Sequence, residues 1–322
     1  MRQTLPFLDR LAVPVIAAPM LRVSGIELVS AACRAGVIGA FPTANAASLD
    51  EFEAWLARLS AQARAADGRL APYCPNLIMR RDPQRVMAEV EIIVRYQAEV
   101  VITSVGSPAA VIPALHAGGC RVLADVASIH HAQRAIEAGV DGLVLLTAGA
   151  GGHTGWANPF AFVRAVRAMY DGPLVLAGGI SDGVALKAAM VLGCDLCSMG
   201  TRFIATHESL GTATYKEMLS CSSLDDVMTT RAFTGLPANF LRPSIAQCGL
   251  DPDALDETVT VQEARRRFGG GSEDTPIQRW ADLWSAGHSV SGVPGVSSVA
   301  EVVRELCTEY GAIGGRRGVD VD

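Results

Sequence analysis

The sequence has very little lysine and no long apolar run. Only Lys187 and Lys216 are lysines, and the formal net charge is −6. This acidic balance argues against the basic surface typical of proteins that bind nucleic acid. No apolar run approaches the roughly 18–20 residues that cross a bilayer, and the first ten residues lack the pattern of a secretion signal. We therefore expect a cytoplasmic protein with neither nucleic-acid nor membrane partners.

Several familiar catalytic signatures are also missing. The chain contains no G-x-S-x-G element, no G-x-x-x-x-G-K-[ST] loop and no pair of histidines at metal-binding spacing. Its eight cysteines are scattered, and we interpret them as buried thiols, including the C-x-x-C pair Cys194 and Cys197. A serine hydrolase, a nucleoside triphosphatase and a metalloenzyme are therefore disfavoured, and we predict no metal site.

Short apolar runs rich in β-formers alternate with amphipathic segments up to residue 200. The expected strands are residues 13–18, 37–41, 71–77, 100–103, 121–124, 142–146, 174–177 and 195–199. Eight strand–helix steps favour parallel strands with helical crossovers, and eight is the number that closes a barrel. A doubly wound open sheet is the alternative, but residues 17–25 lack the G-x-G-x-x-G fingerprint. We predict an α/β fold, a (β/α)8 TIM barrel with a mostly helical C-terminal elaboration.

The alternation ends after residue 204. Residues 205–290 are more polar and rich in turns, so we expect a helical insertion over the barrel mouth. The barrel would then comprise residues 1–204 and 291–310, with a closing helix at 299–310. The tail, residues 311–322, is polar and glycine-rich, and we expect it to be disordered.

A glycine-rich loop with one histidine follows the sixth expected strand. Residues 147–160 read T-A-G-A-G-G-H-T-G-W-A-N-P-F, and the histidine is His153. Glycine permits backbone conformations and close ligand approach that a Cβ forbids. Histidine is the side chain best suited to proton transfer near neutral pH. We expect this loop to lie against a planar or anionic ligand, with His153 as the candidate for proton transfer.

Glycines also follow the seventh and eighth expected strands. Residues 177–183 read A-G-G-I-S-D-G, and residues 199–203 read M-G-T-R-F. Barrel active sites lie at the C-terminal strand ends, and phosphate commonly binds after strands seven and eight. Backbone N–H groups at helix N-termini also attract anions. The two loops together predict a phosphate site.

Three other strand ends carry candidate groups. The first expected strand runs into the rigid turn A-P-M at residues 18–20. Asn76 ends the third strand, where a turn residue and a ligand-binding residue are equally good interpretations. Asp125 ends the fifth and either points to the mouth or caps a helix. We interpret the remaining histidines, including His130 and His131, as surface or packing residues.

Four of these segments together resemble the nitronate monooxygenase family, formerly called 2-nitropropane dioxygenase, which includes FMN-dependent NAD(P)H oxidoreductases. They are A-A-P-M (17–20), A-G-G-H-T-G (150–155), L-A-G-G-I-S-D-G (176–183) and M-G-T-R-F-I-A-T (199–206). The similarity extends to W-S-A-G at residues 284–287 and covers nearly the whole chain. Flavin-dependent enoyl-acyl-carrier reductases and quinone reductases share much of this pattern. The resemblance therefore indicates the cofactor more sharply than the substrate.

The resemblance implies that FMN lies across the barrel mouth. The implied cofactor-binding residues are Ala18, Pro19, Met20, Asn76, Asp125, Gly151, Gly152, Ala177, Gly178, Gly179, Gly200 and Thr201. Among them, the glycine loops at 178–179 and 200–201 would hold the phosphate. His153 matches the family's active-site histidine, which is proposed to move a proton beside flavin N5.

Two positions depart from the family pattern. Ala17 stands where many relatives have glutamine, and Asp125 stands where some relatives have lysine. A carboxylate in place of an ammonium changes the field at the flavin and disfavours an anionic substrate there. Both departures concern the substrate and leave the flavin interpretation intact.

The sequence therefore predicts an FMN-dependent oxidoreductase. The leading hypothesis is oxidation of alkyl nitronates with oxygen, with His153 as the proton-transfer residue. One alternative is an NAD(P)H-dependent flavin reductase acting on quinones or enoyl thioesters. Another is a phosphate-binding barrel enzyme without flavin, or a non-catalytic flavoprotein. The expected partner is a small-molecule substrate, and a homodimer is an open option for the assembly.

Overall fold

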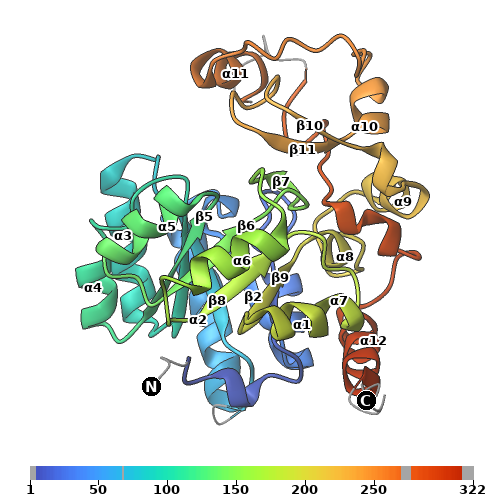
Figure 1. Ribbon diagram of the computed structural model, residues 1–322. Coiled ribbons are helices and arrows are strands. Elements are labelled where there is room, and N and C mark those ends of the chain that lie inside the picture. The colour runs from blue at the N-terminus through green and yellow to red at the C-terminus, as the bar shows by residue number, and fades with distance from the viewer. Residues whose placement is uncertain (1–4, 67–68, 270–276, 314–322) are drawn as a thin grey trace.

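The computed structural model describes residues 5–66, 69–269 and 277–313, and its central element is a closed parallel barrel (Figure 1). The barrel strands, in order, are β1 (Val15–Ala17), β2 (Ile38–Pro42), β3 (Tyr73–Ile78), β4 (Val100–Ser104), β5 (Arg121–Val126), β6 (Gly142–Leu146), β8 (Leu174–Ala177) and β9 (Leu196–Met199). The circle closes where β9 pairs in parallel with β1. The predicted (β/α)8 barrel is confirmed, and each strand overlaps its predicted range.

Helices surround the barrel and connect its strands. They are α1 (Ile26–Ala35), α2 (Leu49–Ala65), α3 (Pro83–Arg95), α4 (Ile112–Ala117), α5 (Ile129–Glu137), α6 (Pro159–Arg167), α7 (Gly183–Leu192) and α12 (Val299–Ala312). Ser48 accepts a hydrogen bond from Glu51 N, so it is the N-cap of α2. Helix α12 packs against α7 and α1 and completes the ring. No described helix is both long and apolar enough to cross a membrane.

The hydrophobic core has an inner and an outer part. Side chains from alternate positions of the strands, such as Ile16, Ile38 and Val100, fill the barrel interior together with Phe7. The opposite faces of the strands pack against the helices in a larger cluster. Because the interior is filled, a ligand has room only beyond the ends of the strands.

Residues 205–269 and 277–290 form a smaller lobe above the C-terminal ends of the strands (Figure 1). The described part of this segment contains α9 (Ala213–Cys221), β10 (Val227–Thr230), β11 (Ala238–Leu241), α10 (Arg242–Gln247) and α11 (Val261–Phe268). The two strands were not expected from the sequence. Strand β11 pairs with β10 and with β7 (Gly152–His153), a two-residue strand in the glycine-rich loop of the barrel. The division into a barrel and an insertion stays our proposal for the domain organisation.

The C-terminal helix extends slightly further than expected. We predicted a helix at 299–310 and a disordered tail at 311–322, but α12 continues to Ala312. Residues 314–322 of the predicted tail lie outside the described residues.

A buried ionic cluster holds together two loops at the barrel mouth. The carboxylate of Glu89, on α3, is fully buried and accepts hydrogen bonds from Arg81 and Arg85, each at 2.9 Å. The hydroxyl of Thr43, just after β2, donates to the same carboxylate at 2.7 Å. Arg81 follows β3, so one carboxylate joins the loops after β2 and β3.

This cluster predicts a large loss of stability for Glu89→Ala. The substitution leaves two arginines without their buried partner, so the free energy of unfolding should fall by about 3 kcal/mol. Urea unfolding followed by circular dichroism measures the change. Glu91→Ala, an exposed position on the same helix, is the matched control and should change the value by less than about 0.5 kcal/mol. Equal losses in the two variants would contradict the structural role of Glu89.

Candidate functional site

A cavity of about 730 Å³ opens at the C-terminal ends of the barrel strands. This volume lies within the range typical of small-molecule and cofactor sites. Every residue that the sequence analysis assigned to the site lines it: Ala18, Pro19, Met20, Asn76, Asp125, Gly151, Gly152, His153, Ala177, Gly178, Gly179, Gly200 and Thr201. The fold therefore brings together groups that are far apart in the sequence, as the barrel prediction required.

The loop after β8, which we call the glycine cradle, contains Gly178 and Gly179. Gly178 and Gly179 both have positive φ angles, +121° and +75°. A Cβ at Gly178 would lie 2.5 Å from Thr147 Oγ1, so this glycine allows two loops to pack together. A Cβ at Gly179 would meet no atom within 4 Å, so it would project into open space. The backbone of Gly179 is therefore accessible to a ligand.

The start of α7 is less available to a ligand than the sequence suggested. Ala185 N donates to the carboxylate of Asp182 at 2.7 Å, and Gly183 N donates to Glu309 Oε2 at 2.8 Å. Two N–H groups of its first turn are thus already bound to carboxylates. A phosphate in this cavity would rely on the glycine loops themselves more than on the N-terminus of α7.

The histidine loop is held by the insertion. Strand β7 pairs antiparallel with β11, with His153 opposite Ala238 and Gly152 opposite Asn239. Gly152 N also donates to Ser285 Oγ at 2.5 Å. The side-chain amide of Asn239 donates to the carbonyls of Ala148 and Ala150, at 3.0 and 2.7 Å. The glycine-rich loop therefore has a defined conformation despite its composition.

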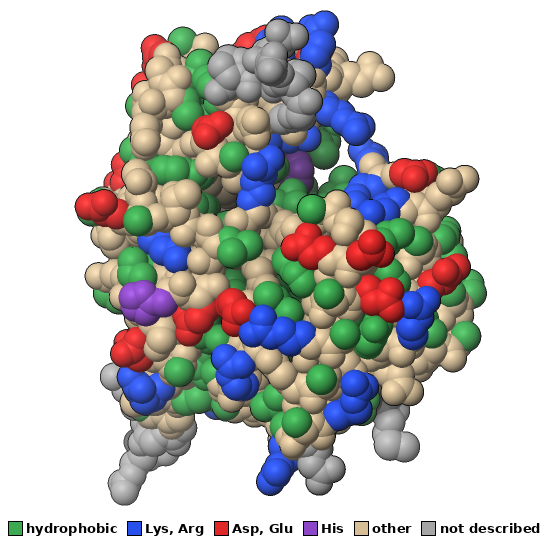
Figure 2. Space-filling model, turned by 180° about the vertical axis from the view of Figure 1, so that it is seen from behind, with side chains coloured by type: hydrophobic (Ala, Val, Ile, Leu, Met, Phe, Trp, Pro, Cys, Tyr) green, Lys and Arg blue, Asp and Glu red, His purple; other side chains and the backbone are tan. Residues whose placement is uncertain are grey.

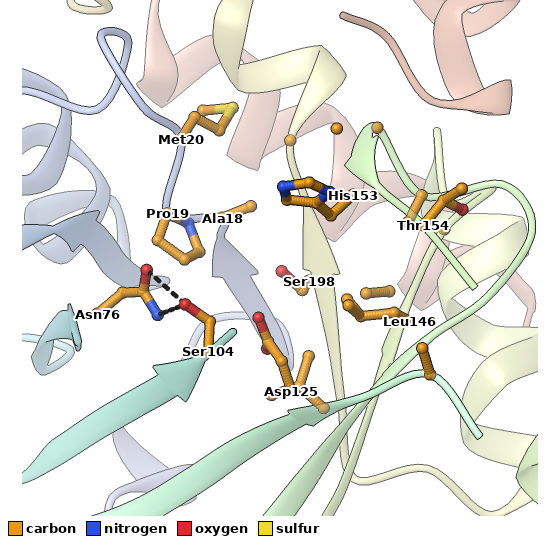
Figure 3. Close-up of a pocket in the computed structure, with 18 of the residues that line it drawn as sticks. Ala18, Pro19, Met20, Asn76, Ser104, Asp125, Leu146, His153, Thr154 and Ser198 are labelled. Atoms are coloured by element: carbon orange, nitrogen blue, oxygen red, sulfur yellow. Dashed lines mark hydrogen bonds between the residues drawn. The ribbon is translucent and has the colours of Figure 1, made fainter. Parts of the chain in front are cut away.

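The imidazole of His153 faces the cavity (Figure 3) and is largely enclosed by protein. Burial lowers its pKa, the positive charge of Arg279 lowers it further, and a hydrogen bond to the backbone of Pro237 opposes both effects. Its Nδ1 atom is buried and has no hydrogen-bond partner among the described residues. An unpaired buried polar atom is costly, and protein atoms cover Nδ1 in this conformation.

Trp280 supports His153 from the insertion side. The two rings meet edge to face with centroids 5.9 Å apart, and Trp280 also stacks on Phe240 at 4.9 Å. Trp280 and Trp284 both line the cavity. Neither tryptophan could be assigned to the site from the sequence, because both belong to a segment without regular periodicity.

Asn76 is held firmly at the end of β3. Its Nδ2 donates to the carbonyl of Ile102 at 3.2 Å and to Ser104 Oγ at 3.1 Å, and its side chain is buried (Figure 3). Asn76 lies inside β3 and lines the cavity, so it is not a turn residue; its role in binding a ligand stays a prediction. Its contact with Ser104, which also lines the cavity, was not expected.

Asp125 projects from β5 into the cavity, which Ser198 of β9 also lines (Figure 3). The surrounding protein raises the pKa of its carboxyl to about 7, and burial is the cause. No hydrogen bond or ion pair joins this side chain to another described residue. Asp125 is therefore a lining residue and does not cap a helix; α5 is capped by Ser128.

Four basic residues at the edge of the cavity were missed or interpreted differently. Arg80, His130, His131 and Arg134 all line it. The two histidines are exposed, as expected of surface residues, but they also face the cavity opening. The spacing of these residues in the sequence does not predict their position at the cavity. The orientation of a side chain in a loop or at a helix start depends on the packing of its neighbours.

The raised pKa of Asp125 predicts a pH-dependent cost in stability. An unfolded Asp titrates near 3.9, so between about pH 4 and pH 7 the folded state holds this proton more tightly than the unfolded chain. The stability contributed by Asp125 is therefore lost as the pH rises through that window. Asp125→Asn should gain in Tm relative to the wild type when the pH is raised from about 5 to about 8.

Thermal unfolding of both proteins without added ligand measures this difference. Asp171→Asn, at an exposed position after α6, is the control for loss of one negative charge. A Tm difference for Asp125→Asn that does not change with pH would contradict the prediction.

Two of the sequence relatives differ in their named activities. A (3aS,4S,5R,7aS)-5-hydroxy-7a-methyl-1-oxo-octahydro-1H-indene-4-carboxyl-CoA dehydrogenase of Mycobacterium tuberculosis is 28% identical over 240 residues, which cover 73% of this chain and 64% of the relative. A nitronate monooxygenase of Paraburkholderia phytofirmans is 26% identical over 350 residues, covering 91% of this chain and 92% of the relative. The chain thus spans slightly less than two thirds of the dehydrogenase.

Solved structures share the fold over almost the full length. FabK from Thermotoga maritima matches with a TM-score of 0.80 at 24% identity, covering 98% of this chain and 97% of that chain. Nitroalkane oxidase from Streptomyces ansochromogenes matches with a TM-score of 0.73 at 23% identity, covering 94% and 97%. At these identities the likeness supports the fold alone.

The family assignment rests on the sequence match over the barrel and the insertion together. A family model described as nitronate monooxygenase matches residues 5–309, which is nearly the whole chain. The chain therefore belongs to the nitronate monooxygenase family of oxidoreductases.

Proposed function

We propose that the protein is an FMN-dependent oxidoreductase in which His153 transfers the proton of the reaction. One observation carries this proposal: the glycine cradle after β8 and the imidazole of His153 line the same cavity. The cradle suits a phosphate, and the imidazole suits a reacting group. FMN, when bound, would supply the electron-transferring centre, as flavins do in other oxidoreductases.

The residues present fit FMN in two respects. The open space beside Gly179, where a Cβ would meet nothing, leaves room for a phosphate at the backbone. Gly200 and Thr201 line the neighbouring part of the cavity. The turn at residues 18–20, Asn76 and the 151–152 backbone line the remaining mouth, where the ring system would lie.

The environment of His153 suits a base. Its lowered pKa keeps the imidazole neutral at neutral pH, so one ring nitrogen is an available acceptor. That unprotonated ring nitrogen can take the proton from the substrate.

Alkyl nitronates with oxygen are the leading substrates, because the chain belongs to the nitronate monooxygenase family. NAD(P)H-dependent reduction of an enoyl thioester or a quinone is the second candidate. Asp125 favours it, since an ionised carboxyl above pH 7 repels an anionic nitronate at this wall. The relative named as a carboxyl-CoA dehydrogenase makes a CoA thioester a reasonable test substrate.

Replacing His153 should separate catalysis from flavin binding. Wild-type holoenzyme is mixed anaerobically with alkyl nitronates, NADH, NADPH, quinones and enoyl thioesters, and flavin bleaching or reoxidation identifies the active substrate. With that substrate, His153→Ala should lower kcat/KM by about 100-fold or more, while the FMN content per chain stays the same. In the wild type, kcat/KM should fall as the pH drops through the pKa of His153, because the protonated imidazole is no longer a base.

His207→Ala, at an exposed histidine that does not line the cavity, is the matched control and should keep full turnover. Full turnover in His153→Ala would exclude the proton-transfer role. A purified protein that binds no FMN would exclude the flavin proposal itself.

Gly179→Ala tests the phosphate cradle. The new methyl group would project into the space proposed for the phosphate, so the Kd for FMN should rise at least about tenfold. Gly119→Ala is a matched control, because Gly119 has a φ of +77° and also leaves its Cβ site open, but lies before β5 at the other end of the barrel. Both variants carry a similar backbone strain of about 1 kcal/mol.

Fluorescence titration of the apoprotein with FMN measures the Kd of each variant. Equal Kd values for Gly179→Ala and Gly119→Ala would show that the phosphate of FMN does not bind at Gly179.

A further inference from the structure

The cavity has a second end that attracts anions. Arg80 follows β3, and His130, His131 and Arg134 lie on the first turns of α5, after β5. We call these four residues the basic rim. In the closed strand order β3 lies directly across the barrel from β8, which carries the glycine cradle, and β5 is separated from β8 by β6. The rim therefore begins opposite the cradle and occupies a different part of the mouth.

Packing directs Arg80 to the opening. Its neighbour Arg81 turns inward to the buried carboxylate of Glu89. Arg80 is exposed and runs beside Gly106, where a Cβ would lie 3.7 Å from Arg80 Cγ. The two consecutive arginines thus have different partners. Arg81 binds the buried carboxylate of Glu89, and Arg80 faces the cavity.

The positive charge of the rim is not neutralised by nearby acids. Arg80 and Arg134 make no ion pair or side-chain hydrogen bond with another described residue, whereas Arg81, Arg85, Arg95 and Arg121 are all paired. Among the described residues that line the cavity, Asp125 is the single acid. The positive N-terminal end of α5, capped by Ser128, adds to the attraction for an anion.

Figure 2 shows a hollow between the barrel and the smaller lobe, with lysine or arginine side chains along its edge and a histidine within it. A ligand that fills the cavity can therefore extend outward through this hollow. A ligand tail that leaves the cavity on this side would pass over the basic rim.

FMN would occupy only one of the two ends of the cavity that attract anions, the glycine cradle and the basic rim. It has a single phosphate, which the proposed function places at the glycine cradle. Resting on that proposed function, we propose that the basic rim binds the phosphates of a nucleoside diphosphate carried by the substrate or electron donor. Pyridine nucleotides and CoA thioesters share this chemistry. Arginine suits it because its planar guanidinium makes paired hydrogen bonds to phosphate oxygens.

Binding measurements on the FMN-loaded protein test this proposal without requiring turnover. Arg80→Gln/Arg134→Gln is compared with Arg231→Gln/Arg304→Gln, a pair of exposed arginines outside the cavity with the same change in charge. The probes are CoA and NADP⁺, each titrated by calorimetry. Pantetheine and nicotinamide mononucleotide are their counterparts without the nucleoside diphosphate.

The rim variant should bind CoA, NADP⁺ or both at least about tenfold more weakly than the wild type. The control variant should stay within about twofold, and pantetheine and the mononucleotide should not distinguish the two variants. Which probe responds tells a CoA thioester from a pyridine nucleotide. Wild-type affinity for that probe should also fall with added salt, because the rim is exposed.

Two results would overturn the proposal. One is a wild-type protein that binds neither CoA nor NADP⁺, and the other is equal weakening in the rim and control variants. Different results would contradict the proposed function: a purified protein without FMN, or a bound flavin that no tested substrate reduces. A protein that binds CoA through Arg80 and Arg134 but lacks FMN would refute the function and keep the rim as a nucleotide site.

Discussion

The pairing of β7 with β11 is the contact on which the rest of the site depends. It joins Gly152 and His153, in a loop of the barrel, to Ala238 and Asn239 in the insertion. A loop so rich in glycine would lose much conformational entropy on ordering. The strand pairing and the amide of Asn239, which binds two carbonyls of the loop, compensate for that loss. The same contact brings Trp280 against the imidazole.

Charge is distributed unevenly around the cavity. Backbone groups of the glycine loops form one end, exposed arginines and histidines form the other, and Asp125 lies between them without a charged partner among the described residues. A carboxyl in such a position stays neutral over a wider pH range than a solvated one. Both ends of the mouth therefore attract anions, while the wall at Asp125 is uncharged as long as its carboxyl is protonated. This distribution agrees with the proposed phosphate-bearing ligand.

The barrel and the position of its site could be predicted because both follow from regular patterns. Alternating apolar runs indicated the eight strands, and the rule that barrel sites lie at C-terminal strand ends placed His153, Asn76 and the glycine loops at one mouth. The pairing of β7, β10 and β11 could not be predicted, since strands of two to four residues are too short to show periodicity. The different directions of Arg80 and Arg81 depend on Glu89, which lies on the following helix. The shifted pKa of Asp125 depends on burial, which no local pattern contains.

Helix α12 has a consequence for the order in which the chain can mature. Its Glu309 accepts the N–H of Gly183 at the start of α7, and a Cβ at Gly183 would lie 2.4 Å from Tyr310 N. The two helices are therefore in contact at the backbone, although they are far apart in the sequence. During synthesis on a ribosome, the sheet can close once β9 has emerged, but the segment after the glycine cradle gains its last partner only with α12. A nascent chain arrested before residue 299 would thus have a complete sheet but no partner for the N–H of Gly183 at the start of α7.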